Sequence, residues 1–168
     1  MDDHFVFVKE DKANELRNAN AFPSDIVITH RATLGQVGLI PQTSLFPRYV
    51  VSQSQMLLTV SPQRSLSRYV YMYLRSSAGQ RSLLANTNQT GVPAIAQPTA
   101  SVRAAPVISP CRPVLEAFGS VVEPLYRRLD YSIRESRILA ALRDALLPKL
   151  ISGDLRVNDA EKFIGRAL

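Results

Sequence analysis

The segment that follows Pro113 restricts the fold most, because it has the pattern of one long helix with an apolar stripe. Its apolar side chains recur mostly at intervals of three or four residues: Phe118, Val122, Leu125, Leu129, Leu139, Leu142 and Leu146. A polar interval at 130–137 interrupts this stripe. A helix of about 30 residues is too long to bury such a stripe against a small domain, so we expect a coiled-coil or bundle contact with another chain. The alternative is a helix that folds back on its own domain.

Proline and glycine set the expected limits of this helix. Pro124 lies where a helix could begin or kink, with Ser120 as a possible N-cap for a new start. Pro148 and the pair Ser152-Gly153 are typical of a helix end, which we place near Leu147.

Upstream of the helix, short β-rich runs predict a small, mostly antiparallel sheet. They occupy residues 25–30, 36–40, 49–51 and 55–60. The first two runs are joined by a short connection that contains Gly35, and this arrangement predicts a hairpin.

Residues 65–77 change to a helical period. Apolar side chains repeat on one face: Leu66, Tyr69, Val70, Tyr73 and Leu74. Three arginines fall on the opposite side and would form an exposed stripe: Arg64, Arg68 and Arg75. This stripe is either a phosphate-binding face or an ordinary solvated helix face.

Five prolines from Pro93 to Pro113 predict an extended or irregular chain at 91–113, such as an edge strand or a connector, and exclude a helix there. The predicted fold class is therefore α+β, with a small β-sheet domain and short helices followed by a long coiled-coil-type helix. We expect a first domain at 1–112, a dimerisation or spacer helix at 113–150 and a C-terminal tail at 151–168.

The charge distribution points to a polyanionic partner. Net charge is +6, and no acidic residue lies between Asp25 and Glu116, a stretch that holds eight arginines and no lysine. A surface that needs only solubility would mix both signs, so this exclusion favours contact with phosphates. Arginine also suits bidentate contacts to phosphate and guanine. Drift toward arginine in a GC-rich genome is the alternative explanation.

A search for catalytic chemistry finds few candidates. His4, His30 and Cys111 are too scattered for a zinc site, and Walker, G-x-G-x-x-G and G-x-S-x-G motifs are missing. The single cysteine fits a reducing compartment, and the acidic start and lack of an apolar run of about 18 residues exclude a secretory signal and a membrane span. We therefore expect a cytoplasmic binding protein that is not an enzyme.

Two stretches carry a family resemblance. Residues 24–38, SDIVITHRATLGQVG, resemble the G-D-I-V-I-T-x-R-G-T-L-G hairpin of type I restriction–modification specificity subunits. Residues 139–157, LAALRDALLPKLISGDLRV, are similar to the end of that family's conserved helix. Ser24 and Ala32 stand where the family hairpin has glycine. The chain has one recognition domain and one helix, where family members usually carry two of each, and it has little sequence ahead of the hairpin.

The resemblance implies a target recognition domain at 1–112, which reads double-stranded DNA, and a helix that spaces two such domains. Expected DNA-binding residues are His30, Arg31, Thr33, Arg48, Gln53, Gln55, Arg64, Arg68, Arg75, Arg81 and Asn88. Expected subunit-interface residues are Leu125, Leu129, Leu139, Leu142, Leu146, Leu147 and Lys149. No cofactor or metal is expected in this chain, because S-adenosylmethionine, ATP and Mg²⁺ would belong to its partners. Those partners would be a methyltransferase (modification) subunit, a restriction subunit and a second half-subunit, most simply a homodimer.

Two other functions remain open at this point. The chain could be a structural remnant that docks on a methyltransferase subunit without reading DNA. It could also be an RNA-binding module, but Tyr69 and Tyr73 lie on the apolar helix face rather than where they could stack on bases.

Overall fold

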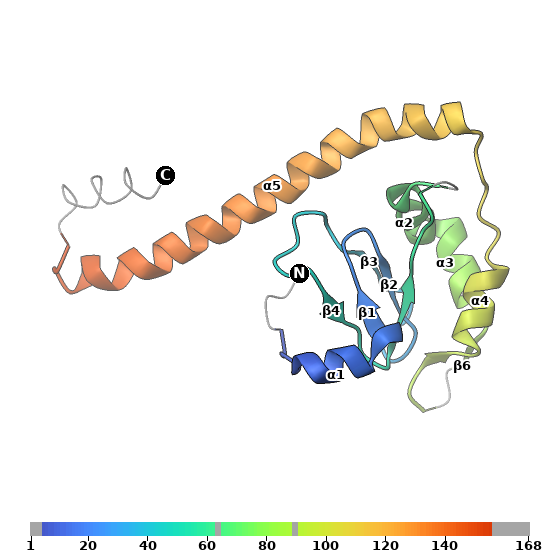
Figure 1. The fold of residues 1–168 in the computed structure, drawn as a ribbon, viewed down its shortest axis with the longest axis horizontal. Coiled ribbons are helices and arrows are strands. Elements are labelled where there is room, and N and C mark those ends of the chain that lie inside the picture. Colours follow the sequence, from blue (N-terminus) through green and yellow to red (C-terminus); the bar gives the residue numbers. More distant parts are fainter. Residues whose placement is uncertain (1–4, 63–64, 89–90, 156–168) are drawn as a thin grey trace. The chain divides into compact units, whose positions relative to one another are not determined.

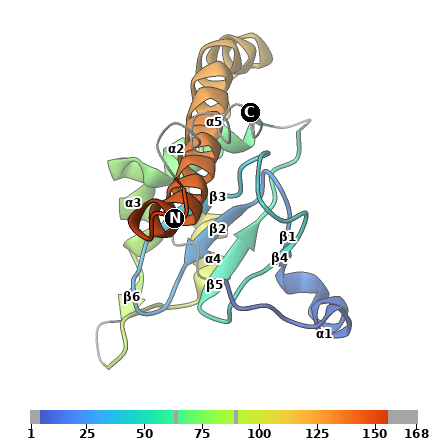
Figure 2. The ribbon, with the colours of Figure 1, turned by 90° about the vertical axis from the view of Figure 1, so that its left-hand side faces the viewer.

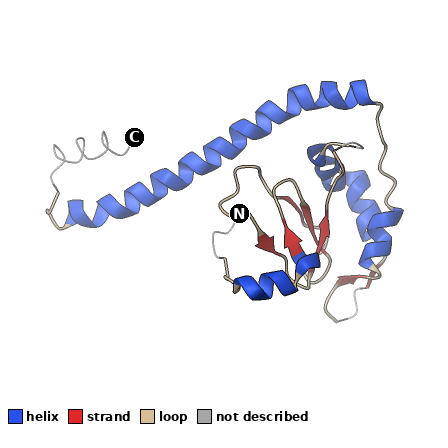
Figure 3. Ribbon diagram, viewed as in Figure 1, coloured by secondary structure: helices blue, strands red, loops and turns tan. Residues whose placement is uncertain are grey.

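The computed structural model describes residues 5–62, 65–88 and 91–155. It has the α+β architecture that the sequence predicts, with short antiparallel strands, several short helices and one long helix (Figures 1 and 3). The chain divides into two compact units between Glu123 and Pro124, so the first unit includes the start of the long helix. The strands are β1 (Asn20–Ala21), β2 (Ile26–Thr29), β3 (Val37–Leu39), β4 (Tyr49–Val50), β5 (Gln55–Leu58), β6 (Thr87–Asn88) and β7 (Ala94–Ile95). The helices are α1 (Glu10–Glu15), the 3-10 turn η1 (Arg17–Ala19), α2 (Ser67–Arg75), α3 (Ser77–Leu84), α4 (Pro98–Ala104) and α5 (Arg112–Ile151).

The central sheet has the strand order β3-β2-β5, and both pairings are antiparallel. The predicted hairpin is confirmed as β2 and β3, with Ile26 opposite Leu39 and Ile28 opposite Val37. Because side chains alternate along a strand, these four residues point to one face of the sheet.

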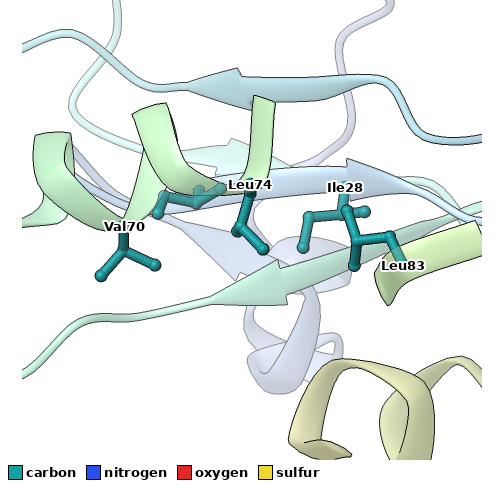
Figure 4. Close-up of a cluster of buried hydrophobic side chains, with 5 residues drawn as sticks. Ile28, Val70, Leu74 and Leu83 are labelled. Atoms are coloured by element: carbon teal, nitrogen blue, oxygen red, sulfur yellow. The ribbon is translucent and has the colours of Figure 1, made fainter. Parts of the chain in front are cut away.

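This face carries the core. Ile26 and Ile28 are fully buried and meet Val70 and Leu74 of α2 and Leu83 of α3, as Figure 4 shows for four of the five. Figure 2 shows α2 and α3 on one side of the sheet and α1 on the other. The predicted apolar face of residues 65–77 is thus confirmed by the burial of its central residues.

A sharp junction lets α2 and α3 pack on the sheet in succession. Ser76 caps α3, and its hydroxyl oxygen accepts a hydrogen bond from the Gly79 N–H at 3.2 Å. A Cβ at position 79 would collide with the Tyr73 carbonyl oxygen, so only glycine fits this close approach.

The proline-rich segment departs from its prediction. The sequence predicts no helix within 91–113, but Pro98–Ala104 form α4, with a proline in its first turn. Proline is well tolerated there because the first helical N–H groups have no partner within the helix. The expected edge strand is present as β7, which pairs with β6.

The start of α5 packs on α2. Leu115 is buried, the rings of Tyr69 and Phe118 meet edge to face at 5.6 Å, and Glu123 accepts a hydrogen bond from Arg68. The hydroxyl of Tyr73 donates to the Pro106 carbonyl at 2.7 Å, which fixes the connector between α4 and α5.

Within the second unit, α5 continues from Pro124 to Ile151, so no new helix starts at Pro124 and Ser120 is not a cap. The helix ends four residues beyond the expected Leu147. Gly153 has a φ of +78°, the left-handed conformation in which glycine commonly ends a helix.

Two residues of the hairpin region hold a conformation that favours glycine. Ser24 has a φ of 76° and Ala32 a φ of 66°, at the two positions where the resembling family hairpin has glycine. A side chain in this region costs about 1–2 kcal/mol relative to a right-handed conformation. Ser24 and Ala32 therefore adopt a backbone conformation that glycine would adopt more easily.

We expect Ala32→Gly to raise the free energy of unfolding by about 0.5–1 kcal/mol, because relief of the left-handed strain exceeds glycine's larger chain entropy in the unfolded state. Urea unfolding measures the change. As a control, Ala78→Gly in the exposed face of α3 should lower stability by about 0.5 kcal/mol. Equal losses in both variants would contradict the strain at position 32.

Candidate nucleic-acid interface

Three connecting segments meet at one end of the central sheet, and we call them together the loop edge. They are the β2–β3 connection (30–36), the turn that leads into β5 (52–55) and the described parts of the β6–β7 hairpin (86–88 and 91–95). Figure 1 places these segments at the lower end of the sheet.

Backbone hydrogen bonds of His30 join the three segments. Its N–H donates to the Ser54 carbonyl at 2.9 Å, and its carbonyl accepts from the Ile95 N–H at 2.9 Å. Beside it, the Ala32 N–H donates to the Pro93 carbonyl at 2.8 Å. These main-chain hydrogen bonds therefore help to set the relative positions of the three loops.

Six of the predicted DNA-binding residues come together at this edge: His30, Arg31, Thr33, Gln53, Gln55 and Asn88. Arg31, Thr33, Gln53 and Asn88 are exposed, whereas His30 is half-buried. The side chain of Gln55 accepts a hydrogen bond from the Ser52 N–H at 3.0 Å and so stabilises the turn.

Arg81 belongs to a helix that is tied to the same edge. The neighbouring Gln80 donates from its side-chain amide to the Gly35 carbonyl at 2.9 Å and to the Leu74 carbonyl at 2.8 Å. Gly35 has a φ of 73°, and a Cβ there would clash with Gln80. Arg81 itself is exposed on α3.

The segments of the loop edge contain no acidic residue, since none occurs between Asp25 and Glu116. Glu15, which lines a groove together with Gln53, is paired with Lys12 at 2.7 Å. Asp25 itself is buried at the opposite end of β2, where its carboxylate accepts from the Thr59 hydroxyl at 2.7 Å and the Phe22 N–H at 2.8 Å. Exposed arginine and amide side chains therefore dominate this surface, which suits phosphates and base edges.

The prediction that Arg64, Arg68 and Arg75 form one exposed stripe is wrong, because Arg68 is buried. Arg68 is only 7% exposed, and its Nε donates to the Glu123 carboxylate at 2.8 Å. The start of α5 covers this side of α2, a contact between distant segments that the helical period alone cannot reveal. Arg75 is exposed and donates to the Tyr71 hydroxyl at 2.7 Å, with its guanidinium over that ring. Arg64 lies outside the described residues.

Arg48 is half-buried, and its side chain donates to the Asn14 side-chain oxygen of α1 at 2.8 Å. This hydrogen bond links the residue before β4 to α1, so Arg48 does not belong to the loop edge.

Sequence reasoning missed two exposed arginines beside the sheet. Arg17 of η1 and Arg103 of α4 flank a groove of about 1040 Å³ along β5. Because an extended chain was expected at 91–113, Arg103 was not predicted to lie on a helix beside the sheet. The helix-compatible run that begins at Pro98 was the signal that could have placed it.

The predicted interface residues on α5 differ in solvent exposure. Leu125, Leu129, Leu139 and Leu147 are more than half exposed, and Lys149 is also exposed. Leu142 is half-buried, and Leu146 is 8% exposed, so Leu146 is already covered within the chain. On a helical wheel at 100° per residue, the four exposed leucines fall within about 80°. They form one apolar stripe.

Other kinds of site find little support in the described residues. Within residues 5–62, 65–88 and 91–155, no three His, Cys, Asp or Glu side chains gather as a metal site. None of the helices in those ranges combines the length and the apolarity of a membrane span.

Comparison with known proteins gives one partial similarity. Over 53 residues the chain is 42% identical to the type I restriction enzyme MjaIX specificity subunit of Methanocaldococcus jannaschii. The matched stretch is 32% of this chain and only 12% of that protein. No family model matches the chain. The similarity supports the resemblance to specificity subunits over part of the chain.

We expect Arg68→Met to lower the free energy of unfolding by about 1–3 kcal/mol, since it removes a charge-assisted hydrogen bond from a buried position. Arg75→Met, on the exposed side of the same helix, should change it by less than about 0.5 kcal/mol. Urea unfolding compares the two variants. Equal effects would contradict a structural role that is particular to Arg68.

Proposed function

We propose that this chain recognises double-stranded DNA as a specificity component of a type I restriction–modification complex, and that the loop edge is its DNA-contacting surface. The observation that carries the proposal is the joining of three loops by the His30 backbone. These loops expose Arg31, Thr33, Gln53 and Asn88 and contain no acidic residue. The partial similarity to a restriction enzyme specificity subunit supports the same function.

The side chains of the loop edge, together with Arg81 on the adjoining helix α3, divide by chemistry. Arg31 and Arg81 would neutralise phosphates and fix the position of the duplex. Thr33, Gln53 and Asn88 carry the hydroxyl and amide groups that hydrogen-bond to base edges, with amides suited to adenine. In this proposal the chain needs no cofactor and catalyses nothing. Methylation and cleavage would belong to a modification subunit that uses S-adenosylmethionine and a restriction subunit that uses ATP and Mg²⁺.

Salt dependence of DNA binding tests the loop edge. Removing one arginine–phosphate interaction should reduce the slope of log K against log salt by about 0.9, so Arg31→Ala combined with Arg81→Ala should reduce it by about 2. Fluorescence anisotropy with a random-sequence duplex between about 50 and about 200 mM KCl measures the slope.

The matched control is Arg112→Ala. Arg112 is exposed at the start of α5 and pairs with Glu116 at 2.9 Å. Figure 1 shows the start of α5 at the end of the first unit that lies away from the loop edge. Further along α5, Glu123 lines a pocket with Asp25 and Thr59, at the same end of the sheet. The control should keep the slope of the unaltered protein. An unchanged slope in the double variant would reject the loop edge as the DNA surface.

The proposal extends to the helix. We propose that the exposed leucines of α5 pair two copies of the chain in antiparallel fashion, so that two recognition domains read a two-part site. The polar interval at 130–137, with exposed Arg134 and Glu135, would then lie beside its counterpart and let acid meet base. The segment from Leu147 onward would dock the modification subunit.

Leu139→Asp should convert the dimer to a monomer, because it places a charge in the apolar stripe. Gel filtration with light scattering at tens of micromolar protein decides the mass. Ala141→Asp, about 200° further around the same helix, should remain dimeric. A strictly monomeric unaltered chain would overturn the pairing.

A further inference from the structure

Strand β5 lies at an edge of the central sheet, and among the described residues β2 is its one sheet partner. The hydrogen bond from the His30 N–H to the Ser54 carbonyl fixes the phase of the ladder between them. In the antiparallel register, the pair Ile28–Met56 is hydrogen-bonded, whereas the pair Val27–Leu57 is not. The N–H and carbonyl of Leu57 therefore point away from β2, toward the open edge.

The groove of about 1040 Å³ runs along this edge. It is lined by four consecutive residues of β5, Gln55–Leu58, which means that it follows the strand rather than one face of the sheet. One wall comes from Leu16 and Ala19 around η1, and the other from Val102 of α4. Among the described residues, no backbone hydrogen bond to Leu57 occurs from either wall.

Each wall of the groove carries an arginine. Arg17 and Arg103 are exposed, and neither has an ion-pair partner within the described part of the chain. Glu15 also lines the groove, but its carboxylate is held by Lys12 at 2.7 Å. The groove thus combines an open strand edge, apolar walls and two arginines without carboxylate partners.

We infer that this groove binds an extended peptide segment of a partner protein, which adds to β5 as an antiparallel or parallel strand. Main-chain hydrogen bonds to Leu57 would supply the pairing, apolar side chains would contact the walls, and flanking acidic residues would meet Arg17 and Arg103. Duplex DNA fits less well, because its charged backbone would have to lie against Leu16, Ala19 and Val102. The inference goes beyond DNA recognition and does not depend on it.

The test uses the full chain and a fluorescent peptide of about seven alternating valine and glutamate residues, a typical strand length. Leu57→Pro removes the outward N–H without removing a ladder bond to β2, since proline is accepted on edge strands at such positions. Loss of the hydrogen bond and the added ring should weaken peptide binding about tenfold or more. Leu57→Val keeps the N–H and should bind within about twofold of the unaltered chain.

Two further arms make the result independent of how well Leu57→Pro folds. A peptide N-methylated at its central valine should lose binding to the unaltered chain, because it cannot pair as a strand. Arg17→Glu with Arg103→Glu should also weaken binding.

Several outcomes would overturn the inference. The first is no binding by the unaltered chain at millimolar peptide. The second is equal binding of the N-methylated peptide, which would mean attraction by charge alone. The third is competitive displacement of the peptide by a random-sequence duplex together with weaker DNA binding by Leu57→Pro, which would assign the groove to DNA.

Discussion

The proposed recognition surface depends on two hydrogen bonds made by the backbone of His30. Its N–H and carbonyl are directed to opposite neighbours, the turn before β5 and the β6–β7 hairpin. Loops usually vary in position because few contacts restrain them. Here the backbone hydrogen bonds of the sheet continue past the end of β2. They join the β2–β3 connection to the turn before β5 and to the β6–β7 hairpin, so side chains from distant parts of the sequence share one surface.

The absence of acidic residues over about ninety positions has two consequences in this fold. It leaves Arg31 exposed at the loop edge, beside hydroxyl and amide groups, and Arg81 exposed on the adjoining helix α3. Elsewhere, Arg68 has no acidic residue within the 26–115 stretch to pair with, and it pairs with Glu123 of α5. One of the eight arginines therefore stabilises the junction between the sheet domain and the long helix rather than offering a charge to DNA.

The elements set by local pattern were predictable from the sequence. Alternation and turn residues predicted the β2–β3 hairpin, the helical period predicted α2, and the leucine spacing predicted α5. Features that depend on contacts between distant segments were not predictable in this way. The burial of Arg68 requires knowledge that α5 returns to α2, and the helix at Pro98–Ala104 requires knowledge that Val102 packs on the core.

In the candidate site too, local pattern predicted some features, whereas others depend on contacts between distant segments. Arg31 and Thr33 were found because a hairpin connection was evident, and Gln53 because a turn precedes β5. Their proximity to Asn88 depends on the bond between His30 and Ile95, which no periodicity encodes. The open edge of β5 also required the sheet order, since a run of residues does not reveal whether a strand has one neighbour or two.

Amide hydrogen exchange of the chain with and without a DNA duplex tests the central claim most directly, because it locates the bound surface without any substitution. We predict that DNA slows exchange in the peptides that contain residues 30–36, 52–55 and 86–95, while α1 and the connector at 105–111 keep their rates. Slowed exchange confined to α1 or to α5, with all three segments of the loop edge unchanged, would contradict DNA recognition by the loop edge.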